Sequence, residues 1–188
     1  MAGTTIPLGH DRPSVKGNDA LLSKHSAVDA SGELRVKLID GVRFRAVRPV
    51  LHEDGTLTEI ARQAWPEIDL PIVQVHVTST LPGRVRAWGL HERSTDRLFV
   101  VSGMVSIVVY DARHGSETFD AINHFLIGDR SPGLLVIPPN LYHGWRNIGT
   151  TEAFIVNLPS VQYNYDEPDA RDLPYESPEA SEIVPFRW

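Results

Sequence analysis

The 188-residue sequence contains no cysteine. Disulfide bonds, thiolate metal sites and a cysteine nucleophile are therefore excluded. No stretch reaches the roughly 20 apolar residues of a membrane-spanning helix, and the first residues lack the basic start and apolar run of a secretion signal. We therefore expect a cytoplasmic protein with no membrane partner.

Positive charge is also scarce, with a formal net charge of −6. Broad binding of nucleic acid depends on basic surfaces and is not expected here. A few well-placed arginines are still enough to hold one phosphate group. An anionic ligand is therefore expected only in a pocket of limited size.

The composition of the chain changes twice, which predicts one domain with two extensions. Residues 1–38 are rich in Gly, Pro, Ser, Asp and Lys, and predict an N-terminal arm. Residues 39–160 carry short apolar runs separated by turn signals such as Asp54-Gly55 and Ser102-Gly103, a spacing typical of an all-β barrel. Residues 161–188 end in an apolar tip that we expect to pack on the barrel.

Residues 71–79 alternate with period two. In a sandwich of two sheets, the polar face of such a strand meets solvent, whereas in a barrel it can line the interior. The pattern alone leaves both interpretations open. The polar face carries Ile72, Gln74, His76 and Thr78, and the other face carries Val73, Val75 and Val77.

Two segments carry residues suited to chemistry. In residues 88–97, an extended chain points His91 and Arg93 the same way. In residues 133–147, an apolar run ends in a Pro-Pro turn followed by His143. Together they resemble the paired motifs of the cupin superfamily, although Asn140 stands where the second motif has glycine. Asparagine tolerates positive φ, so we expect the turn to survive. The resemblance implies a jelly-roll β-barrel.

Metal-binding cupins hold their ion with His-x-His, a glutamate a few residues on and a later histidine. Here His91 and His143 remain, but Arg93 stands at the second histidine and Arg97 stands at or next to the glutamate. Because guanidinium groups do not bind cations, we expect no metal and no cofactor, but a pocket for an anion. Two alternatives stay open: a metal-dependent cupin oxygenase or isomerase using both histidines, and arginines that merely pair with Glu92 and Asp96 on the surface.

Ordered segments between about residues 40 and 169 resemble the dTDP-4-dehydrorhamnose 3,5-epimerase family, a cupin branch that works without metal. Residues 74–79 resemble Gln-x-Asn-x-Ser, and Gly89-Leu90-His91 resembles Arg-Gly-Leu-His. Residues 97–103 resemble Lys-Leu-Val-x-Val-x-x-Gly, and residues 111–119 resemble Asp-x-Arg-x-Gly-Ser-Pro-Thr-Phe. Residues 137–144 resemble Ile-Pro-x-Gly-x-x-His-Gly.

The resemblance implies a homodimeric isomerase that acts on a nucleotide-linked, dTDP-type 4-keto-6-deoxy sugar. A base removes a proton next to the ketone, and a donor returns one. His91 matches the base, Arg97 takes the place of the family's lysine, and Asp111 matches an aspartate of the active-site region. The expected substrate-binding residues are Glu59, Gln74, His76, Arg93 and His143.

Several family residues are missing. The donor tyrosine corresponds to Val156, so Tyr163 or Tyr165 is expected to replace it. The arginine before Gly-Leu-His is Trp88, which leaves Arg84, Arg86 or Arg93 to contact phosphate. The family's C-terminal Leu-Ser-x-Lys-Asp motif, whose aspartate supports the catalytic histidine, is not found. A non-catalytic cupin that binds a nucleotide sugar or another anion therefore stays an alternative.

Overall fold

The computed structural model describes residues 37–188, so nearly all of the expected N-terminal arm, residues 1–38, lies outside the described part of the chain. The described residues form strands with one short α-helix and one 3-10 helix. None of the helices in residues 37–188 is long and apolar enough to cross a membrane.

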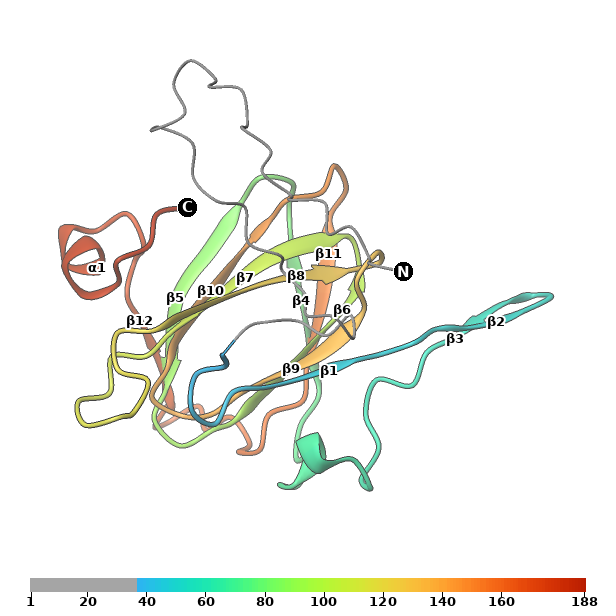
Figure 1. Ribbon diagram of the computed structural model, residues 1–188, viewed down its shortest axis with the longest axis horizontal. Coiled ribbons are helices and arrows are strands. Elements are labelled where there is room, and N and C mark those ends of the chain that lie inside the picture. The colour runs from blue at the N-terminus through green and yellow to red at the C-terminus, as the bar shows by residue number, and fades with distance from the viewer. Residues whose placement is uncertain (1–36) are drawn as a thin grey trace, which may run out of the picture. The chain divides into compact units, whose positions relative to one another are not determined.

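Two five-stranded antiparallel sheets face each other (Figure 1). The order in the first sheet is β1-β9-β6-β11-β4, and in the second it is β12-β5-β10-β7-β8. Strands distant in the sequence are thus neighbours in each sheet, as in a jelly roll. The predicted all-β, cupin-type class is confirmed.

The elements have the following bounds. The first sheet contains β1 (Arg43–Ala46), β4 (His76–Thr80), β6 (Asp96–Ser102), β9 (Gly133–Ile137) and β11 (Ala153–Asn157). The second contains β5 (Val85–His91), β7 (Met104–Tyr110), β8 (Ile122–Gly128), β10 (Tyr142–Asn147) and β12 (Ala170–Asp172). Outside them lie the hairpin of β2 (Val50–His52) and β3 (Gly55–Leu57), the 3-10 helix η2 (Pro66–Ile68) and α1 (Pro178–Ile183).

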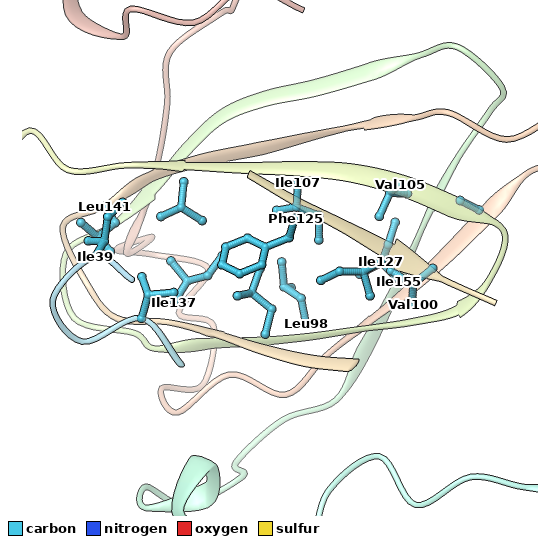
Figure 2. Close-up of a cluster of buried hydrophobic side chains, with 14 residues drawn as sticks. Ile39, Leu98, Val100, Val105, Ile107, Phe125, Ile127, Ile137, Leu141 and Ile155 are labelled. Carbon is cyan, nitrogen blue, oxygen red and sulfur yellow. The ribbon is translucent and has the colours of Figure 1, made fainter. Parts of the chain in front are cut away.

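The main apolar core fills part of the space between the sheets, as Figure 2 shows. On β7, Val105, Ile107 and Val109 alternate toward this core, because successive side chains of a strand point to opposite faces. Leu98 and Ile155 reach it from the first sheet. Burial of these side chains stabilises the pairing of the two sheets.

The C-terminal segment covers the outer face of the second sheet. Trp88 from β5 packs there against Phe186 and Trp188, and the Trp88 and Trp188 ring centroids are 5.1 Å apart. The residue that replaces the family's arginine before Gly-Leu-His thus points away from the interior of the barrel.

Residues 71–79 follow the barrel interpretation of their alternation. β4 begins at His76 and pairs with β11. Val77 faces outward and is 60% exposed, whereas His76 and Thr78 line a cavity between the sheets. The polar face of this segment is therefore the inner one.

Candidate active site

A cavity of about 460 Å³ lies between the two sheets. Its walls come from β4, β6 and β11 on one side, and from β5, β10 and the β12 segment on the other. Among the described residues, the polar lining combines carboxylates, imidazoles, an amide, a phenol and one guanidinium group. These side chains are Arg86, His76, His91, Asp96, His143, Asn157, Asp172 and Tyr175.

Backbone contacts bring the two predicted motif segments together. His91 ends β5, and His143 lies opposite Gly89 in the pairing of β5 with β10. The Asn140 N–H donates to the His91 carbonyl at 2.7 Å. Asn140 has a φ of 63°, so the predicted tolerance of the turn for asparagine is confirmed. As a result, the two imidazole rings stack with centroids 5.8 Å apart.

Asp96 joins these histidines. It is 3% exposed, and its Oδ2 lies 3.3 Å from Nε2 of His91 and 3.3 Å from Nε2 of His143. Its Oδ1 accepts a hydrogen bond from Asn157 Nδ2 at 2.9 Å. Burial disfavours the charged carboxylate, but the hydrogen bonds with both histidines outweigh burial and hold the pKa of Asp96 far below its usual range.

A second carboxylate reaches the other side of His91. Asp169 Oδ2 lies 3.6 Å from His91 Nδ1 and accepts from the Ser94 N–H at 2.9 Å. Asp169 Oδ1 accepts from both N and Nε of Arg93. The loop that carries Arg93 therefore fixes Asp169 against the ring of His91.

The two carboxylates govern the protonation of His91. Burial alone lowers the pKa of this imidazole, but the hydrogen bond to Asp96 and the negative charges of Asp96, Asp169 and Asp172 raise it overall above its ordinary value. The sequence left His91 without a carboxylate partner, and the structure supplies two. A histidine held in this way is oriented at both nitrogens.

Arg97 lies on the opposite face of β6 from Asp96, and the structure does not bring it to His91. It is fully buried, and its guanidinium donates to the carbonyls of Glu67, Leu70, Pro71 and Leu158. Arg97 thus ties the segment around η2 to the barrel. The motif itself carried the missing signal: counted back from Gly103, the lysine of Lys-Leu-Val-x-Val-x-x-Gly falls on Asp96 rather than on Arg97.

Asp111 also lies outside the cavity lining. It is completely buried and forms an ion pair with Arg113 at 2.8 Å. Ser116 and Thr118 donate their hydroxyls to the same carboxylate. These contacts outweigh the effect of burial and hold the pKa of Asp111 far below its usual range. This geometry makes Asp111 the organiser of a tight loop.

The family follows from comparison with known proteins. The model of the dTDP-4-dehydrorhamnose 3,5-epimerase family matches residues 38–181. The chain belongs to this family. A probable low-salt glycan biosynthesis epimerase, Agl13 of Haloferax volcanii, is 30% identical over 73% of this chain and 89% of its own length. The spore coat polysaccharide biosynthesis protein SpsL of Bacillus subtilis is 28% identical over 80% of this chain and 97% of its own.

Solved structures of similar proteins share the fold of this chain. A dTDP sugar isomerase from Desulfovibrio desulfuricans matches with a TM-score of 0.73 and 25% identity, over 80% of this chain and 92% of its own. NovW of Streptomyces spheroides, a 4-keto-6-deoxy sugar epimerase, has the same fold, with a TM-score of 0.69 and 22% identity over 89% of this chain and 82% of its own. The expectation of an isomerase-family enzyme is confirmed.

The sequence resemblance places the family's donor tyrosine at the position of Val156. Here Val156 packs with Phe99 and Leu134 in a second apolar cluster. Tyr163 is 44% exposed and Tyr165 is 86% exposed, and neither lines the cavity. Among residues 37–188, the structure therefore places no tyrosine of this region beside His91.

The other predicted substrate-binding residues are divided. His76 and His143 line the cavity, whereas Arg93, Glu59 and Gln74 do not. Glu59 pairs with Arg62 at 3.4 Å. Gln74 accepts a hydrogen bond from the Tyr163 N–H at 2.9 Å.

The cavity also holds a possible donor set for a divalent ion. One ligand atom each from His91, Asp96 and His143 lie within 4.8 Å of one another. Two imidazoles and one carboxylate suit first-row transition metals. The other ring nitrogen of His91 faces Asp169, and that of His143 faces the Leu141 carbonyl at 3.1 Å, as is usual around metal-binding histidines. Asp96 was missing from the set considered from sequence.

Proposed function

We propose that this protein epimerises a nucleotide-linked, dTDP-type 4-keto-6-deoxy sugar by removing and returning a proton beside the ketone, without a metal. One observation carries the proposal: His91, at the family position of the base, faces a cavity between the carboxylates of Asp96 and Asp169. The name of the dTDP sugar isomerase that is 25% identical supports the same substrate class.

The proposed chemistry uses His91 in its neutral form. The ketone acidifies the hydrogen on the neighbouring ring carbon, and the neutral imidazole accepts it as a proton. Asp169 beside Nδ1 keeps the ring in place and stabilises the imidazolium that forms. Asp96 keeps its hydrogen bonds from His143 and Asn157 while the proton moves.

Arg86 is our candidate for the diphosphate. Of the three arginines considered from sequence, Arg86 alone lines the cavity, at the opposite end of β5 from His91. A shift in the pairing of β5 with β10 lies next to it, and Arg86 and Ala87 both contribute to the lining. Its guanidinium lies 6.0 Å from the Trp145 ring centroid. The substrate would then extend along β5.

A deuterium experiment tests the proposal. The protein is incubated with dTDP-4-keto-6-deoxyglucose in deuterated water, and C3 and C5 are followed by NMR. We expect deuterium at one or both carbons with wild type and none with His91→Asn. Stabilisation by dTDP without any exchange would support the non-catalytic alternative instead.

The donor set of His91, Asp96 and His143 supports a second candidate, a metal-dependent cupin oxygenase or isomerase. Dialysis against EDTA followed by elemental analysis separates the two. Under our proposal, exchange is unchanged after dialysis. Loss of exchange that returns on addition of one divalent ion would favour the second candidate.

We also propose a cytoplasmic homodimer with no nucleic-acid or membrane partner. Exposed patches of large apolar side chains are typical of an interface. The β2–β3 hairpin extends from the barrel (Figure 1). The hairpin residues Val50, Leu51 and Leu57, and the outer-face residues Val77, Val101 and Phe154 of the first sheet, are exposed. Light scattering that gives a monomer at micromolar concentration would contradict the dimer.

A further inference from the structure

Epimerisation removes a proton from one face of a sugar-ring carbon and adds one to the opposite face. The residues predicted as acid and base do not serve both faces. His91 and His143 come from neighbouring strands of one sheet, with their rings stacked at an interplanar angle of 20°. Both therefore approach a bound sugar from the same wall. The donor for the other face has to come from the facing sheet.

His76 lies on that facing sheet. In the pairing of β4 with β11, His76 stands opposite Asn157. The Asn157 amide donates to Asp96, which contacts His91. Because neighbouring strands are about 4.8 Å apart, His76 stands about 10 Å from β6 at the level of this hydrogen-bonded chain. His76 and the proposed base His91 line the same cavity.

The other cavity-lining side chains that can exchange a proton either lie on the same side of the cavity as His91 or already contact both histidines. Tyr175 and Asp172 belong to the segment that pairs with β5, the strand of His91. Asp96 belongs to the facing sheet but contacts both histidines. The imidazole of His76 is exposed, and no hydrogen bond joins it to another described residue.

We propose that His76 is the catalytic residue that gives a proton to the ring face opposite His91, in place of the family's tyrosine. Histidine gives and takes protons near neutral pH. The residue at this place in the family motif Gln-x-Asn-x-Ser is asparagine, which cannot do so. This inference rests on the proposed epimerase function and names a residue for it.

His91 takes the hydrogen beside the ketone as a proton, the C–H pair becomes the double bond of an enolate, and the carbonyl π pair moves to oxygen. Protonated His76 then forms a new C–H bond on the opposite face of the same carbon, while the oxygen lone pair restores the ketone. His91 ends protonated and His76 neutral, and exchange with water resets both.

The test is His76→Gln in the full chain, assayed with dTDP-4-keto-6-deoxyglucose in deuterated water. We expect the epimerised product to form at least about 100-fold more slowly, because the donor is lost. His91 still exchanges its proton with solvent, so deuterium enters with retained configuration at a rate within several-fold of wild type. His114→Gln, which changes an exposed histidine of the loop between β7 and β8 outside the cavity lining, is the matched control and leaves both rates unchanged.

The outcomes are distinguishable. Epimerisation by His76→Gln within threefold of wild type overturns the inference, as does loss of epimerisation in Tyr163→Phe or Tyr165→Phe. If wild type itself incorporates no deuterium, the proposed function fails, and the assignment of His76 fails with it. Unchanged thermal unfolding of His76→Gln separates loss of the donor from loss of the fold.

Discussion

One oxygen of Asp96 lies 3.3 Å from Nε2 of His91 and 3.3 Å from Nε2 of His143. A buried carboxylate thus connects the two histidines that the motifs predicted. Because the second carboxylate that contacts His91, that of Asp169, lies at the other ring nitrogen, the imidazole is held between two negative charges. The behaviour of this group of side chains is open to direct test.

Asp96→Asn should move the pH dependence of deuterium exchange. His91 acts when neutral, so kcat/KM rises with pH through the raised pKa of His91. Removing the charge of Asp96 leaves only Asp169 and Asp172, among the described residues, as the anions that raise the pKa of His91. We therefore expect the rising limb to shift to lower pH. A limb that stays in place would show that Asp96 does not set the pKa of the base.

Asp169→Asn should slow exchange while leaving the binding of dTDP unchanged. The carboxylate faces Nδ1 of His91 and stabilises its protonated form, so we expect a fall in kcat of at least about 10-fold. Isothermal titration with dTDP provides the binding readout. Arg93→Gln is the milder control. It loses the side-chain hydrogen bond from Arg93 to Asp169 but keeps the negative charge of Asp169 beside His91. Equal losses of kcat in both variants would point to collapse of the loop instead.

Arg97→Lys should reduce stability and not catalysis. A lysine cannot donate to all four carbonyls that Arg97 contacts, and buried carbonyls are left unpaired. We expect a loss of about 2 kcal/mol, which lowers the Tm by roughly 4–8 °C. The folded fraction should exchange deuterium within threefold of wild type. A variant with normal Tm and no exchange would place Arg97 in the chemistry after all.

Arg86→Gln should weaken binding of dTDP by about 5- to 10-fold, because one charge-assisted contact is lost at a solvent-exposed position. Arg84→Gln is the matched control, since Arg84 is an exposed arginine outside the cavity lining. Titration calorimetry with dTDP at two salt concentrations measures both variants. If only Arg84→Gln weakens binding, the diphosphate lies elsewhere.

The sequence predicted the fold class and the meeting of His91 with His143, because turn spacing and motif order are local signals. It misplaced Arg97 because side chains alternate along a strand. A register error of one residue moved the predicted cavity group from Asp96 to its neighbour on the opposite face. The sequence also left open which face of β4 points inward. The same alternation is expected in a sandwich with its polar face toward solvent and in a barrel with a polar interior.

Asp169 could not be predicted for a different reason. It is distant from His91 along the chain and lies outside any motif that the chain shares with its family. Only the pairing of β12 with β5 brings this part of the chain to the catalytic strand. Contacts of this kind depend on the tertiary fold and leave no local pattern.

The two carboxylates around His91 also have a consequence for substrate binding. A negatively charged ligand that enters this cavity adds to the anionic surroundings of the His91 imidazole and favours its protonated form. Binding is therefore linked to uptake of protons from the buffer, and affinity falls as the pH rises. Proton abstraction needs the neutral base and becomes faster as the pH rises. Binding of the sugar nucleotide therefore favours a lower pH, whereas its conversion favours a higher pH.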